Sequence, residues 1–224
     1  MTADAGALQP VPAETGHPGP PLVVQEGHLA RGISNPILGM LLFITSEVMF
    51  FSGLFAAYFS TRARELGSDP WKAGAKILND ALPSPDHPLS LIVIATVVLI
   101  SSSFTCQFAV WAIQRGDRTG FIRNIAITFV LGITFLVMQA IDYSTLFGHG
   151  LTLSSSMFGT TYFTLTGFHG AHVFGGVLML GVILYRGMSG QFSARHHDAV
   201  EAVSFYWHFV DIVWIILFST LYLL

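Results

Sequence analysis

The chain has 224 residues, of which 52% are hydrophobic and only 10% are charged, with a formal net charge of -3. This balance indicates a membrane protein with several transmembrane helices and excludes a soluble domain. Nucleic acid is not expected as a partner because the sequence has no basic run, and the single cysteine, Cys106, excludes an internal disulfide and a CxxC motif.

The first 34 residues differ in composition from the rest of the chain, because they are rich in Pro, Gly and Ala and lack a long apolar segment. They also lack the basic start and apolar core of a signal peptide. We therefore predict a polar, mobile N-terminal tail over residues 1–34 and a transmembrane domain over residues 35–224. His17 and His28 in the tail are expected to be solvated rather than metal ligands.

Five apolar segments follow, each long enough to cross a bilayer as a helix. Asn35 and Pro36 mark the start of the first one, because these residue types favour the N-cap and the first helical position. Residues 61–88 are expected to be a polar connection in which Trp71 anchors at the membrane interface. The predicted spans are residues 37–59, 89–112, 121–143, 157–185 and 200–222. The sequence thus predicts an all-α polytopic membrane bundle of five transmembrane helices.

The distribution of Arg and Lys predicts the orientation of this bundle. With a cytoplasmic N-terminus, six basic residues lie on the inner side, namely Arg31, Arg115, Arg118, Arg123, Arg186 and Arg195. Four lie on the outer side, namely Arg62, Arg64, Lys72 and Lys76. The positive-inside rule therefore favours a cytoplasmic N-terminus and a C-terminus outside.

The fourth span contains two histidines near its middle, His169 and His172. An ionisable group at that depth costs roughly 2.5 to 3.5 kcal/mol on insertion scales unless protein or water receives it, so both histidines are expected to face other protein and are functional candidates. On the adjoining helix face, Gly167, Ala171 and Gly175 form a stripe of small residues. We expect another helix backbone to approach closely along this stripe.

The first and fifth spans carry ionisable side chains in the same layer. On the fifth, Glu201, Ser204, His208 and Asp211 fall within about 80° of one another on a helical wheel. Counted from the same side of the membrane, Glu47 lies at roughly 15 Å and Asp211 at roughly 16 Å along their helices. We therefore expect one shared polar cluster, made of Glu47, His169, His172, His208 and Asp211.

Three roles stay open for such a cluster on the residues alone: hydrogen bonding between helices, interaction with protons or lipid, and metal binding. A di-iron bundle needs carboxylates from two helices and Glu-x-x-His pairs from two others. The chain offers His169-x-x-His172, His208-x-x-Asp211 and a single Glu47, which is a partial match. Several metals are not expected without a cysteine pair, so other chains are expected to complete the chemistry.

Several strings of this sequence resemble subunit III of the haem-copper terminal oxidases, in the order of that family. They are SE at 46–47 with FF at 50–51, WA at 111–112 with GDR at 116–118, QA at 139–140, TGFHGAHV at 166–173 and YWHFVDIVW at 206–214. The last two strings are highly specific. Longer members have two further helices where this chain has its polar tail, and many have Glu at the position of Asp142.

The resemblance implies a non-catalytic subunit of an aerobic respiratory cytochrome c oxidase, which reduces dioxygen to water and pumps protons. It implies no metal and no catalytic residue in this chain, with haem and copper in the partner subunits I and II. It also implies bound phospholipid, support of proton uptake and stability, a bacterial inner-membrane location and membership of a respiratory supercomplex. By motif, Glu47 corresponds to the family's membrane glutamate, and the other four cluster residues to its buried polar set.

Two alternatives stay open. A subunit of a quinol oxidase, or an accessory protein of nitric oxide reduction, would have the same features, since subunit III does not meet the electron donor. A stand-alone metal-dependent membrane enzyme belongs to another class of protein, and would hold metal when purified alone.

Overall fold

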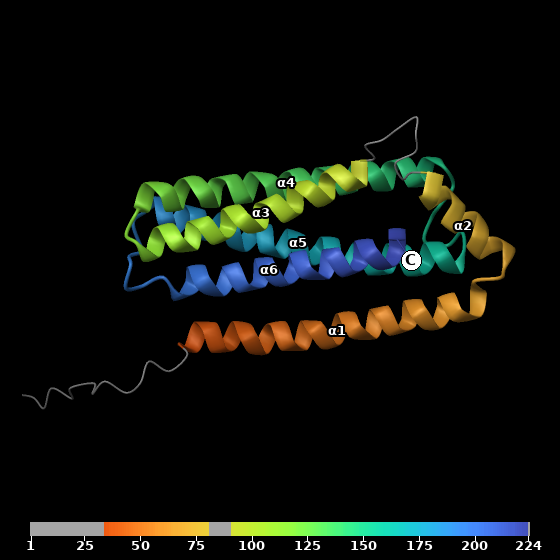
Figure 1. Cartoon of the computed structure of the whole chain (residues 1–224), viewed down its shortest axis with the longest axis horizontal. Helices are drawn as coiled ribbons and strands as arrows, with labels where there is room; N and C mark the ends of the chain where they lie inside the picture. The colour runs from red at the N-terminus through yellow and green to blue at the C-terminus, as the bar shows by residue number, and fades with distance from the viewer. Residues whose placement is uncertain (1–33, 81–90, 224) are drawn as a thin grey trace, which may run out of the picture. The chain divides into compact units, whose positions relative to one another are not determined.

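The structure is a computed structural model that describes residues 34–80 and 91–223. Apart from Ser34, the predicted N-terminal tail lies outside the described residues. The described helices, labelled in Figure 1, are α1 (Asn35–Glu65), α2 (Asp69–Asp80), α3 (Leu91–Gln114), α4 (Arg118–Gly148), α5 (Met157–Met188) and α6 (Asp198–Phe218). The π-helical turn η1 (Ser219–Leu223) follows α6.

Five of these helices, α1, α3, α4, α5 and α6, are long and apolar enough to cross a membrane. The predicted all-α bundle with five spans is thereby confirmed, and the chain is a multi-pass membrane protein. Several helices run beyond the apolar stretches that predicted them. For example, α1 continues to Glu65 with Arg62 and Arg64 in its last turn, because charged residues end a hydrophobic run without breaking backbone hydrogen bonding.

The predicted polar connection between the first two spans is wrong in one respect, because it contains the helix α2. Trp71, Gly74 and Leu78 are buried, whereas Lys72 and Lys76 on the other face are exposed. The ring of Trp71 packs edge-on against Phe158 of α5 at a centroid distance of 5.2 Å. Trp71 is therefore a core residue, only 4% exposed, and not the expected interfacial anchor.

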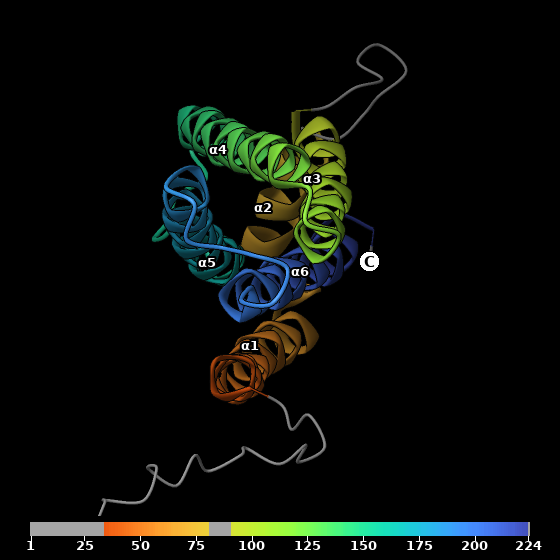
Figure 2. The ribbon, with the colours of Figure 1, turned by 90° about the vertical axis from the view of Figure 1, so that its left-hand side faces the viewer.

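Helices α3, α4, α5 and α6 pack around a common core, with α3 against α4, α4 against α5, and α6 against both α3 and α5. Figure 2 shows these four helices end-on, with α1 outside them and beside α6. Helix α1 packs on α5 and α6. Only 6% of the most apolar window of α1 is buried, against 56% for α6, so the described residues leave most of the surface of α1 uncovered.

Trp207 of α6 has no exposed surface. Two glycines make room for its ring. A Cβ atom added at Gly132 of α4 would lie 2.7 Å from Trp207 Cη2, and one at Gly176 of α5 would lie 2.8 Å from Trp207 Cε3. Both distances are too short for any side chain, so the contact between α4, α5 and α6 requires glycine at both positions.

Among the described residues, no helix backbone approaches closely along the stripe predicted for close helix packing. A Cβ atom at Gly167 would lie 3.8 Å from the Tyr143 hydroxyl, and one at Gly175 would lie 3.6 Å from the Tyr206 hydroxyl. These are ordinary contacts, and Ala171 is exposed. The tight face of α5 instead includes Gly176, one residue further on, because Trp207 fills that side of the helix.

Candidate functional site

The first polar site joins α1 to α5. His172 Nε2 lies 2.8 Å from Glu47 Oε2, and His172 Nδ1 lies 2.7 Å from the Phe168 carbonyl oxygen. A carbonyl oxygen only accepts, so Nδ1 carries a proton and donates it. The contact between Nε2 and Glu47 therefore needs a second proton, which sits either on the ring as imidazolium or on the carboxyl.

Aromatic rings surround this pair. Phe51 lies 4.9 Å from the His172 ring between centroids, and Phe50 lies 6.0 Å from it. The Tyr206 hydroxyl donates to the His172 carbonyl oxygen at 3.2 Å. The side chains of His172 and Glu47 keep only 16% and 18% of their surface exposed. Little water reaches the pair, so its electrostatic attraction is stronger than that of a surface pair.

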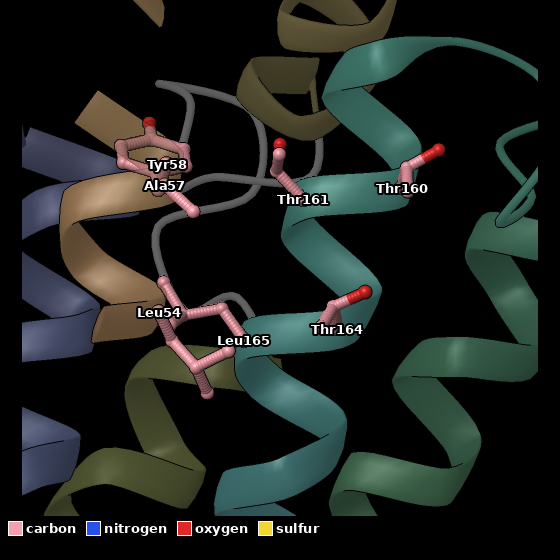
Figure 3. Close-up of a pocket in the computed structure, with 7 residues that line it drawn as sticks. All are labelled: Leu54, Ala57, Tyr58, Thr160, Thr161, Thr164 and Leu165. Atoms are coloured by element: carbon pink, nitrogen blue, oxygen red, sulfur yellow. The ribbon is translucent and has the colours of Figure 1, made fainter. Parts of the chain in front are cut away.

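A pocket of about 210 Å³ opens between α1 and α5. Measured along either helix, it lies about 10 Å, or seven residues, from the Glu47–His172 pair. Thr160 and Thr161 turn their hydroxyls to backbone carbonyls of their own helix and the preceding loop, which leaves methyl groups for the pocket. Figure 3 shows the lining side chains Leu54, Ala57, Tyr58, Thr160, Thr161, Thr164 and Leu165. We call this region, with the polar pair, the α1–α5 groove.

The second polar site lies between α3 and α6, and we call it the α3–α6 seam. Helix α6 turns one face toward α3, and cross-helix hydrogen bonds follow one another along it. They join Gln114 to Glu201 (2.8 Å), Cys106 to Ser204 (3.6 Å), Ser102 to Trp207 (2.9 Å), Gln107 to His208 (3.3 Å), Ser103 to His208 (3.1 Å), Ser103 to Asp211, and Thr96 to Trp214 (3.0 Å).

Asp211 is the most buried of the three ionisable side chains that α6 contributes to this seam, the others being Glu201 and His208. Its side chain is only 4% exposed. Oδ2 is hydrogen-bonded to the Ser103 hydroxyl, whereas Oδ1 is buried without a hydrogen-bond partner among the described residues. A buried polar atom without a partner is unfavourable by about 1 to 3 kcal/mol. This carboxyl group is therefore held by one hydroxyl group and little else.

His169 belongs to neither site. It is completely buried, and neither ring nitrogen has a hydrogen-bond partner among the described residues. Its ring stacks on Trp214 at 4.9 Å and meets Phe135 edge-on at 6.1 Å. It thus acts as an aromatic core side chain.

The expected single cluster is therefore divided into the Glu47–His172 pair, the Ser103–His208–Asp211 group and the isolated His169. No hydrogen bond or ion pair joins these three within residues 34–80 and 91–223. Helical geometry explains the division, since residues three apart point about 60° away from each other, which turns His169 to the core and His172 to α1. The side of α6 that faces α1 carries Phe209, which contacts Phe51.

Sequence reasoning missed the part of α3 that completes the seam. Ser103 bonds to both His208 and Asp211 of α6, yet it sits in a run of three serines, of which Ser101 bonds only to its own helix. Nothing in the sequence distinguishes Ser103 from Ser101.

In the part of the chain that the structure describes, no group of three His, Cys, Asp or Glu side chains is placed to hold a metal ion.

Comparisons of the sequence with known proteins show the family of this chain. The family model described as Cytochrome c oxidase subunit III matches residues 25–224. Cytochrome c oxidase subunit 3 of Corynebacterium diphtheriae is 46% identical over 185 residues, covering 83% of this chain and 86% of that protein. The probable cytochrome c oxidase subunit 3 of Mycobacterium tuberculosis is 43% identical over the same shares of the two chains.

A longer relative, cytochrome c oxidase subunit 3 of Xenopus laevis, is 37% identical over 208 residues, covering 89% of this chain and 75% of its own length. The match thus includes almost all of the described helices, and the resemblance found in the motifs is confirmed. The chain belongs to the cytochrome c oxidase subunit III family.

Proposed function

We propose that this chain is a non-catalytic membrane subunit of a bacterial aerobic cytochrome c oxidase. It packs on subunit I and assembles with subunits I and II, which hold the haem and copper, in the inner membrane with a cytoplasmic N-terminus. Family membership, bacterial relatives and five spans support this proposal. In the complex, the subunit supports proton uptake and the stability of the catalytic subunits, within a larger respiratory supercomplex.

The α1–α5 groove is the part of the subunit that holds phospholipid in this proposal. Its single strongest support is the apolar pocket next to a polar pair that is partly exposed at mid-membrane depth. Part of an acyl chain fits the pocket because its lining is mainly methyl and ring carbon. A headgroup stays at the surface, so the Glu47–His172 pair acts by fastening α1 to α5 and keeping the groove formed.

The experiment compares two neighbouring alanines of α1 in the purified oxidase complex. Both side chains are exposed, but Ala57 lines the pocket and Ala56 does not. Ala57→Phe is expected to fill the pocket and remove one tightly bound phospholipid, counted by native mass spectrometry. Ala56→Phe is expected to retain it, and both complexes are expected to show an unaltered haem spectrum. Equal lipid content in the two variants would contradict the assignment of the groove.

The same preparation separates the alternative functions. Copurification with a subunit II that oxidises cytochrome c supports the proposal, whereas a quinol-oxidising or nitric oxide-reducing complex would favour the first alternative. Stoichiometric iron, copper or zinc in this chain purified alone would favour a stand-alone metal-dependent enzyme.

A further inference from the structure

We propose that Asp211, Ser103 and His208 form an internal proton relay in the α3–α6 seam, with Gln107 as its positioning residue. The relay deepens the proposed function, because it gives the subunit's support of proton uptake a physical carrier. Helices α3 and α6, which supply all four residues, pack against each other along the bundle (Figure 1). Ser103 is the central member because its hydroxyl contacts both His208 Nδ1, at 3.1 Å, and Asp211 Oδ2.

Two arrangements of protons satisfy the same positions of these atoms. In the neutral arrangement, the Asp211 carboxyl donates to Ser103 Oγ, the Ser103 hydroxyl donates to His208 Nδ1, and His208 Nε2 donates to Gln107 Oε1. In the charged arrangement, the Ser103 hydroxyl donates to the Asp211 carboxylate, and His208, now imidazolium, donates to Ser103 from Nδ1 and to Gln107 from Nε2. Both arrangements contain the same number of protons.

Conversion between them needs two short proton transfers and no oxidation or reduction. The O–H bond of Asp211 breaks while a new O–H bond forms at Ser103. The original O–H bond of Ser103 breaks while an N–H bond forms at His208 Nδ1. A positive charge then rests on the ring and a negative charge on the carboxylate, so the net charge of the group is unchanged.

Gln107 fixes the direction of this transfer. Its Oε1 lies 3.3 Å from His208 Nε2 and only accepts. It therefore keeps a proton on Nε2 in both arrangements and leaves Nδ1 as the nitrogen that receives the moving proton. Without Gln107, the ring is free to adopt the other tautomer, in which Nδ1 already carries a proton and the relay is blocked.

The two ends of the relay lie in different surroundings. Asp211 is buried, whereas His208 and Gln107 are partly exposed at the side of the bundle. The unpartnered Oδ1 of Asp211 is the point at which an added donor, such as an ordered water molecule, stabilises the charged arrangement. A proton is thereby moved from the buried carboxyl group to a histidine at the side of the bundle.

The seam continues from His208 and Gln107 toward one membrane surface. Glu201 and Gln114 form a hydrogen bond seven residues before His208 on α6, or about 10 Å along the helix. The contact between Cys106 and Ser204 lies between the two. The relay is thus the mid-membrane part of a polar seam that reaches the surface at Glu201.

Other titratable side chains lie on the elements packed against α6. None of them hydrogen-bonds to Ser103, His208 or Asp211 within the described residues, since each has its own contacts. They include Glu47 of α1 (bonded to His172), Cys106 of α3 (bonded to Ser204), His169 of α5 (stacked on Trp214), His172 of α5, and Tyr222 of η1 (bonded to Tyr162).

The test is infrared difference spectroscopy on the purified oxidase complex during exchange from H2O to D2O. The complex is expected to show a protonated carboxyl C=O band that shifts in D2O and is lost in Asp211→Asn. Ser103→Ala is expected to slow the exchange at this band by about tenfold or more, because the proton must then cross the gap left by the hydroxyl. Absence of an Asp211-dependent band, or unchanged exchange in Ser103→Ala, would overturn the relay.

Two variants provide matched controls. Ser101→Ala removes a hydroxyl from the same helix that bonds only to the Val97 carbonyl oxygen, at 2.7 Å. Ser103→Thr keeps the hydroxyl of the relay. Both are expected to exchange at the rate of the unaltered complex, and slow exchange in either would contradict the assignment.

Should Ser103→Ala prevent assembly, Gln107→Leu gives a second test that leaves the three relay groups in place. Slower exchange at the Asp211 band and altered imidazole ring bands of His208 are expected, whereas an unchanged rate and unchanged ring bands would overturn the proposal. Lipid content and the haem spectrum, which test the proposed function, do not enter this measurement. Failure of the relay is therefore distinguishable from failure of the proposed function.

Discussion

Two adjacent glycines of α5 give the sharpest test of the packing of this subunit. In Gly176→Ala, the added Cβ lies 2.8 Å from the Trp207 ring, whose N–H donates to Ser102 at 2.9 Å. The ring is fully buried and cannot move without losing that bond. Overpacking costs about 1 to 3 kcal/mol and a lost hydrogen bond about 1 kcal/mol, so we expect a loss of about 2 to 4 kcal/mol.

Gly175→Ala is the matched control, because its Cβ meets the Tyr206 hydroxyl at an ordinary 3.6 Å. We expect it to change stability by less than about 0.5 kcal/mol. The assay measures, for each variant, the temperature at which this subunit dissociates from the purified complex in mild detergent. A clear fall for Gly176→Ala with little change for Gly175→Ala is predicted. Equal effects, or a larger one at Gly175, would refute the packing argument and favour the stripe predicted from the sequence.

Three further predictions follow from single contacts. Glu47→Leu is expected to leave His172 Nε2 without its partner and destabilise the α1–α5 contact by about 1 to 3 kcal/mol, with the haem spectrum intact; an altered spectrum in assembled complex would count against the site. Trp214→Phe and Thr96→Val are each expected to lower the dissociation temperature, because each removes the same 3.0 Å hydrogen bond between Trp214 and Thr96. The double variant is therefore expected to lower this temperature little further than either single variant. If the two decreases add fully, the bond is unimportant. Gly74→Leu is expected to displace α2 from α5, because its Cβ would lie 2.8 Å from an α5 ring; unchanged protease sensitivity of α2 would contradict this.

The five spans were predictable because hydrophobic length alone defines a transmembrane helix. Helix α2 was not predicted, because the polarity and the prolines of residues 61–88 indicate a loop. Its own periodicity was available, since Trp71, Gly74 and Leu78 recur on one helical face and are all buried. The predicted first span, residues 37–59, is shorter than α1, because hydropathy marks the part of a helix that lies in the membrane and not the end of the helix.

The partners of the site residues were less accessible to sequence reasoning. Equal depth in the membrane suggested that Glu47, His169 and Asp211 meet, but depth does not say which way a side chain points. Rotation about each helix axis decides this, and it depends on which neighbours fill the core. Trp207 shows the effect, because the space for its ring fixes the facing sides of α5 and α6 and turns Asp211 toward α3.

The proposed function requires that this subunit belong to a cytochrome c oxidase and carry no redox centre. The most direct measurement is to remove it from the purified complex with detergent and to determine haem, iron and copper in both fractions. We predict that all haem and copper stay with the remaining subunits, whose haem spectrum is unchanged. Stoichiometric haem or copper in the fraction that contains this chain would contradict the account.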